Sequence, residues 1–242
     1  LWVMMTPNLR GYVRSVGVVA LIWRLILTSG TGAIFGFLVA RDAYDTAIMA
    51  PLFILMSLSL GMAVFWVSTL TMCRWNGYRV APELSEKLRR LSAVFVLGVL
   101  FLMALHHLTN IYMAHHQGIE RFLLVDGGVY PWLFWLGFVL CGSIVPVWWY
   151  LDRRFCSPAW TVTTALMVIV GGLCHLYVTI IGAQAYPLRL VSGYRVDSGF
   201  YDGEITHYLP TLPELALGIG GVSLALLMTV VAVRILPFLP TV

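Results

Sequence analysis

The stretch LSAVFVLGVLFLMALHHLTNIYMAHHQGIERF, residues 91–122, decides the fold class. It opens with a long apolar run and then carries four of the six histidines of the chain. A helix needs about 20 mostly apolar residues to cross the hydrocarbon core of a bilayer. The run therefore predicts a membrane-spanning helix, with its histidines near one end.

The rest of the chain has the same apolar character. Of its 242 residues 60% are hydrophobic and 11% are charged, and the mean hydropathy is +0.88. This composition excludes an ordinary soluble domain and predicts a protein whose main partner is the lipid bilayer. The sequence pI of about 9.0 reflects basic residues between apolar runs, so no nucleic-acid partner is expected.

Five further runs are long and apolar enough to span a bilayer, which predicts an all-α, polytopic transmembrane helix bundle. We expect a single transmembrane domain over residues 1–242, as a fragment of a longer protein, since the chain starts at Leu1 without a signal-peptide pattern. The six predicted spans are 16–40, 48–72, 91–113, 129–151, 160–183 and 215–236.

The basic residues between the spans predict the orientation. Ten of them fall on the side that carries both chain ends: Arg10, Arg14, Arg74, Arg79, Lys87, Arg89, Arg90, Arg153, Arg154 and Arg234. The other side carries four: Arg41, Arg121, Arg189 and Arg195. By the positive-inside rule both ends are cytoplasmic. The long outer loop, 184–211, is expected to pack on an external partner or cap the bundle, or else to be a solvated connection.

An ionisable group inside a span usually faces protein rather than lipid. Arg24 either extends its long side chain to the interface or holds an anion or a quinone oxygen. His175 is either a hydrogen-bonded buried histidine or a ligand. The small-residue patterns around Gly32–Gly36 and Gly171–Gly182 predict close helix approach.

The adjacent His106 and His107 point about 100° apart on a helix. Their depth in the third span is close to that of His175 in the fifth, so a haem held between these spans is one hypothesis. Polar packing without a dedicated role is another.

A proton relay is the third hypothesis for the histidines, since imidazole exchanges protons near neutral pH. It would run from His106 or His107 through His115 and His116 to the outer surface. Glu120 and Arg121 follow and are expected to form a surface pair.

No metal site is predicted in this chain. Its four cysteines, Cys73, Cys141, Cys156 and Cys174, form no C-x-x-C pair and lack the spacing of iron–sulfur or structural zinc ligands. Any iron–sulfur centre would belong to a partner subunit.

Two stretches resemble a known family. They are HYLPTLPELALGIGGVSLALLMTVVAVRILPFLP, His207 to Pro240, and ERFLLVDGGVYPWLFWLGFVLCGSIVPVWWYL, Glu120 to Leu151. Together they resemble the carboxyl-terminal part of the NrfD/PsrC family, the polysulfide reductase membrane subunits. The long outer loop is most similar to that of DsrP, the membrane subunit of sulfite-reductase-associated complexes.

The resemblance implies that this chain has the function of the family's membrane subunits. Such subunits pass electrons between membrane menaquinone or ubiquinone and an outer-face iron–sulfur subunit, without haem or metal of their own and without a catalytic residue in this part. It also implies further membrane and cytochrome subunits, a prokaryotic inner membrane and a place in sulfur metabolism.

The resemblance also suggests site residues. Arg41 matches a basic residue that often follows the Phe-Gly turn, and Ser29 and Thr31 stand where relatives often carry a histidine. With Arg24 they form the expected quinone-site neighbourhood. Glu214 matches the acid of the final-helix motif and is expected to cap that helix, or alternatively to carry protons.

Two other functions stay open at this stage. A secondary transporter or channel would show interrupted helices and inverted repeats, and we find no repeat. A b-type cytochrome anchor would bind haem through the histidines.

Overall fold

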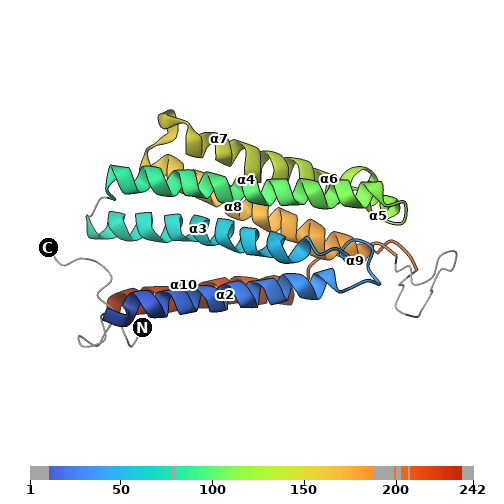
Figure 1. Cartoon of the computed structure of the whole chain (residues 1–242), viewed down its shortest axis with the longest axis horizontal. Coiled ribbons are helices and arrows are strands. Elements are labelled where there is room, and N and C mark those ends of the chain that lie inside the picture. Colours follow the sequence, from blue (N-terminus) through green and yellow to red (C-terminus); the bar gives the residue numbers. More distant parts are fainter. Residues whose placement is uncertain (1–10, 78–79, 188–198, 200–202, 207, 236–242) are drawn as a thin grey trace. The chain divides into compact units, whose positions relative to one another are not determined.

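The computed structural model describes residues 11–77, 80–187, 199, 203–206 and 208–235, and every regular element in these ranges is a helix (Figure 1). Six helices there are long and apolar enough to cross a membrane, which confirms the predicted all-α, multi-pass architecture. In chain order the elements are α2 (Val13–Gly36), α3 (Met49–Asn76), α4 (Pro82–Tyr112), α5 (Gln117–Arg121), η2 (Phe122–Asp126), α6 (Val129–Trp132), η3 (Leu133–Ile144), α7 (Val145–Leu151), η4 (Arg153–Phe155), α8 (Pro158–Tyr177), η5 (Val178–Gly182), α9 (Ala183–Ala185) and α10 (Leu212–Ile235).

The predicted third span differs most from the observed helix. α4 begins at Pro82, nine residues before the expected start at 91, with proline in its first turn and Glu83 beside it. Both residues favour a helix N-terminus. The polar segment after them forms helix that extends beyond the apolar run, and hydropathy does not detect it. The first span ends at Gly36 rather than 40, because turns follow it.

The chain divides into two compact units. One unit comprises Leu1–Trp23 and His207–Val242, and the other comprises Arg24–Thr206. The second unit, called the bundle below, contains four long helical rods: α3, α4, α6 with η3 and α7, and α8 with η5 and α9 (Figure 1). α3 packs against α4 and α8, and the rod of η3 and α7 closes the set by packing against α8 and α4.

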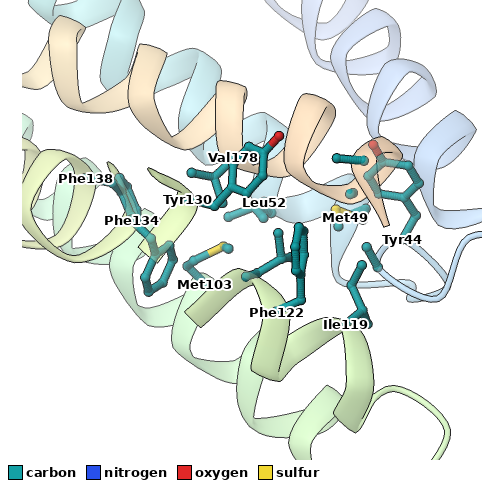
Figure 2. Close-up of a cluster of buried hydrophobic side chains, with 14 of the residues drawn as sticks. Tyr44, Met49, Leu52, Met103, Ile119, Phe122, Tyr130, Phe134, Phe138 and Val178 are labelled. Carbon is teal, nitrogen blue, oxygen red and sulfur yellow. The ribbon is translucent and has the colours of Figure 1, made fainter. Parts of the chain in front are cut away.

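The interior of the bundle has two hydrophobic clusters. The larger one joins α3, α4, α5, η2, η3 and η5, and Figure 2 shows Met103, Phe122 and Val178 converging in it from different helices. The smaller one surrounds Trp66 and Tyr150 in the other half of the bundle. Burial of these side chains stabilises the packing of the rods within the bundle.

Glycines allow the closest approaches in the bundle. A Cβ added to Gly171 of α8 would collide with the Cα of Gly142 in η3, so both positions require a bare backbone. Gly32 and Gly36 lie as closely against the backbone around Met49 and Thr46. The predicted close approach at both small-residue patterns is thus confirmed. Most of the predicted outer loop, 184–211, lies outside the described residues.

Each end of the bundle buries a charged side chain. At the end formed by the start of α4 and by η4, here called the basic end, Arg89 is 2% exposed. Its Nη2 donates to the carbonyl oxygens of Trp149, at 2.6 Å, and Asp152, at 3.1 Å. Its Nη1 also contacts Cys156. Arg89 thereby fixes the turn between α7 and α8 to α4.

Candidate functional site

The opposite end of the bundle, here called the histidine end, is built by a reversal of the chain after α4. The chain leaves α4 at Tyr112 and turns back in α5, whose first turn is fixed by a hydrogen bond from the Glu120 amide to the His116 carbonyl, 3.1 Å. On α4, Asn110 lies one turn beyond His106, so both side chains project from the same helix face. The reversal brings Glu120 beside them.

The side chains of His106, His107, Asn110, His116 and Glu120 form a buried group that we call the histidine cluster. Each is at most 7% exposed. The Glu120 carboxylate contacts two of the others: Oε2 lies 2.6 Å from Nδ1 of His107, and Oε1 accepts a hydrogen bond of 2.8 Å from Nδ2 of Asn110. Nδ2 of Asn110 also lies 3.4 Å from Nε2 of His106.

The prediction that Glu120 and Arg121 form a surface pair is wrong. Glu120 is 2% exposed and faces the bundle, while Arg121 points outward and pairs with Asp126 at 2.6 Å. Adjacent residues on a helix point in different directions, and a helix as short as α5 shows no readable apolar face. Sequence reasoning also missed Asn110, although its spacing of four from His106 is the signal that could have found it.

The cluster is chemically suited to hold and move a proton. With its proton on Nδ1, His107 donates to Glu120 and presents Nε2 as an acceptor. Within the described part of the chain, Nε2 of His107 and Nδ1 of His116 are buried and have no hydrogen-bond partner. Imidazole nitrogens and one carboxylate thus share a buried cluster, away from bulk solvent.

Three side chains of the cluster are also of the types that bind metal ions. One ligand atom each from His106, His107 and Glu120 lie within 4.8 Å of one another. Two ligands of one zinc ion, each about 2 Å from the metal, are separated by roughly 3 Å or more. The 2.6 Å contact between Nδ1 of His107 and Oε2 of Glu120 is a direct hydrogen bond, so these two atoms are not spaced as ligands of one ion.

A polar chain of contacts leads from the cluster to the surface. The ring of His115 lies against that of His116, with centroids 5.5 Å apart. His115 is half exposed, and its Nε2 lies 3.0 Å from Oδ1 of the buried Asp42. In the predicted relay, from His106 or His107 through His115 and His116, the structure puts His116 in the buried cluster and His115 at the surface. The relay itself stays a prediction.

The loop between α2 and α3 is anchored beside this chain of contacts. Nη1 of Arg41 donates to the carbonyl oxygens of Tyr186, at 3.0 Å, and Gln184, at 3.3 Å. The hydroxyl of Tyr44 donates to the carbonyl of Ile180, 3.1 Å. Burial raises the pKa of Tyr44 to about 12, although the nearby Arg41 acts to lower it. These contacts hold the loop against η5 and α9.

His175 lies deeper in the bundle, stacked on Phe138 at a centroid distance of 4.4 Å. Phe138 contacts Phe134, which in turn contacts His107, so phenyl rings link the two histidines. A cavity of about 20 Å³ next to His175 has room for one water molecule but not for a haem. This arrangement does not fit the haem hypothesis for these helices.

The other predicted site residues are described by their local contacts. Arg24 is exposed, and the hydroxyls of Ser29 and Thr31 donate to carbonyls of their own helix, at Leu25 and Leu27. Glu214 accepts a hydrogen bond of 2.9 Å from the amide of Thr211 and another from the hydroxyl of Tyr208. It thus binds the amino end of α10, as a capping carboxylate does.

Comparison with known proteins identifies the family of this chain. The family described as "Polysulphide reductase, NrfD" matches residues 2–187. The "Hdr-like menaquinol oxidoreductase integral membrane subunit" of Archaeoglobus fulgidus is 26% identical over 225 residues, which cover 91% of this chain and 56% of that protein. A putative membrane subunit of a dimethyl sulfoxide reductase from Halobacterium salinarum is 27% identical over 224 residues, which cover 87% of this chain and 50% of that protein. The chain thus spans about half the length of these relatives, and no solved structure gave a significant match. Because the family match extends over most of its length, as the NrfD/PsrC resemblance predicted, the chain belongs to the NrfD family of multi-pass membrane proteins.

Proposed function

We propose that this chain is part of an integral membrane subunit of a quinol-linked oxidoreductase complex, and that its histidine cluster accepts the protons of the quinol. The observation that carries the proposal is the buried Glu120 carboxylate, held by His107 and Asn110 inside a membrane bundle. Family membership supplies the context, since one relative is named as a menaquinol oxidoreductase subunit and another as a dimethyl sulfoxide reductase subunit.

The chemistry requires a proton acceptor away from bulk water. Oxidation of one quinol to a quinone releases two electrons and two protons. The electrons would leave to an iron–sulfur partner subunit. A hydroxyl proton would go to an imidazole nitrogen of the cluster, where Glu120 stabilises the positive charge that forms. His116, His115 and Asp42 would then carry protons to the surface.

Several finer features belong to the same proposal. The quinone would be menaquinone or ubiquinone, with Arg41 at the edge of its site. The iron–sulfur partner would dock at the histidine end, on the outer face of a prokaryotic inner membrane, with both ends of this fragment cytoplasmic. Further membrane and cytochrome subunits and a DsrP-like role in sulfur metabolism are also proposed, and Glu214 is a second candidate proton carrier.

The test is quinol turnover by the full-length protein in its complex, with and without Glu120→Gln. The amide keeps the shape of the side chain but cannot stabilise an imidazolium as a carboxylate does. We expect turnover to fall about 100-fold, the low end of what a positioned proton acceptor contributes. His107→Ala should lower turnover comparably.

Arg121→Gln is the matched control, because this neighbour of Glu120 is exposed and pairs only at the surface. We expect it to leave turnover unchanged. If Glu120→Gln melts like the wild type and turns over quinol at the wild-type rate, the cluster has no role in the reaction. A haem spectrum lost with His107→Ala would support the cytochrome alternative, and solute transport without quinol turnover would support the transporter alternative.

A further inference from the structure

A second site lies at the basic end of the bundle, away from the histidine cluster. There the end of α3 and the starts of α4 and α8 enclose a cavity of about 880 Å³. Binding sites for small amphiphilic molecules typically have volumes of about 300–1,000 Å³, with mostly apolar walls and a few placed polar groups. This cavity has both the size and the composition of such a site.

The inner wall of the cavity is apolar. It includes Trp66, Leu70 and Val162, which lie on the membrane-spanning parts of α3 and α8. The indole of Trp66 is fixed, since its Nε1 donates to the hydroxyl of Ser92 at 3.1 Å. A hydrocarbon chain would find a preformed surface here.

The outer part of the cavity is positively charged. Arg74, in the last turn of α3, lines it, and no described carboxylate lies within ion-pair distance of this side chain. The first-turn prolines of α4 and α8, Pro82 and Pro158, line it as well. The amino ends of α4 and α8, each with a partial positive charge, therefore border the same space as the guanidinium. The carboxyl end of α3, whose partial negative charge Arg74 offsets, borders it too.

Of the acidic residues nearby, Glu83 is exposed in the first turn of α4 and does not line the cavity. Glu86 is engaged by Arg90, 2.8 Å away, and lies 3.6 Å from Arg89. Asp152 accepts a hydrogen bond from the amide of Arg154. Arg74 thus remains available for an anion at the opening of the cavity.

We propose that this cavity binds an anionic phospholipid, with its phosphate at Arg74 and its acyl chain along Trp66, Leu70 and Val162. Charge complementarity favours this occupant, because a guanidinium and two helix amino ends match the full negative charge of a phosphate better than the neutral carbonyls of a quinone. The location fits as well, because the cavity joins the membrane-spanning wall to the end of the bundle where basic residues gather. Bound lipid would brace α3, α4 and α8 at this end.

The experiment uses the full-length protein in its complex, transferred into phosphatidylcholine nanodiscs containing phosphatidylglycerol, with retained lipid counted by native mass spectrometry. We expect Arg74→Gln to lower the preference for phosphatidylglycerol about fivefold, the effect of one basic side chain near an anionic lipid. Arg153→Gln is the matched control, because Arg153 is exposed at the same end but does not line the cavity.

Filling the cavity gives an independent measurement. Val162→Phe should reduce retention of phosphatidylglycerol, while thermal melting shows whether the variant is folded. The proposal is overturned if Arg74→Gln keeps the wild-type lipid preference, or if Val162→Phe releases a quinone rather than a lipid. Equal retention of both lipids by the wild type would overturn it too.

Discussion

The basic end and the histidine end of the bundle each bury a side chain that ordinarily carries charge, but they bind it in different ways. Arg89 and Glu120 are both 2% exposed. Arg89 donates to the backbone carbonyls of Trp149 and Asp152, whereas Glu120 contacts only side chains, those of His107 and Asn110, among its described side-chain hydrogen bonds. Backbone carbonyls cannot change their protonation state, and imidazoles can.

This difference separates a structural charge from a chemical one. The guanidinium of Arg89 stays protonated, and its two carbonyl partners exchange no proton, so these hydrogen bonds hold the turn in place. At the histidine end a proton added to one ring changes the charge next to Glu120 without moving the backbone. The first network therefore stabilises the fold, and the second is the one to which we assign the proposed function.

Removing Arg89 should have the largest effect of the variants that probe this contrast. Arg89→Ala leaves buried carbonyls without their donor, and we expect it to lower the free energy of unfolding by about 3 kcal/mol or more. Arg90→Ala, which removes an exposed partner of Glu86, should cost less than about 1 kcal/mol. Denaturant unfolding in detergent measures both, and equal losses would contradict a structural role specific to Arg89.

Arg89 and Arg90 also show a feature that could not be predicted from the sequence, namely which of two neighbouring basic side chains is buried. The segment ELSEKLRRL predicts a polar surface, and hydropathy cannot tell which of two adjacent arginines is buried. Burial is decided by η4, a turn more than sixty residues later in the chain. Glu120 was missed for a similar reason, because a five-residue helix carries too little periodicity to show its inner face.

The fold itself was predictable because it depends on a local property. Apolar runs of span length are visible in the sequence, and the predicted span 129–151 matches the observed helical segment from Val129 to Leu151. The four histidines near the end of α4 were also visible. Their partners were not, because hydrogen bonds between distant segments depend on how the chain turns between them.

A second variant tests whether packing at the middle of the bundle affects the reaction proposed for the histidine end. Gly142 and Gly171 cross between the two hydrophobic clusters, and a methyl group on Gly171 would meet the Gly142 backbone. Gly171→Ala should therefore lower the free energy of unfolding by about 2 kcal/mol and reduce quinol turnover as well.

Gly61→Ala is the matched control for this crossing, because a Cβ at Gly61 of α3 meets nothing within 4 Å. It should not destabilise the protein, since alanine favours a helix over glycine. A Gly171→Ala protein with lowered stability but unchanged turnover would show that the histidine end keeps its geometry independently of the crossing.

The smallest predicted effect concerns Tyr44, a backbone-bound group at the histidine end. Burial disfavours its phenolate, so the pKa of Tyr44 is raised from 10.0 to about 12 in the folded protein. A group with a raised folded-state pKa contributes stability that is fully present below pH 10 and is lost as the pH rises toward 12. The wild type should lose about 1 kcal/mol more than Tyr44→Phe between pH 9 and pH 11. Parallel unfolding curves for the two proteins across this range would contradict the burial of the hydroxyl. A steeper loss in the wild type would show that the histidine end, like the basic end, has a polar group that serves the structure.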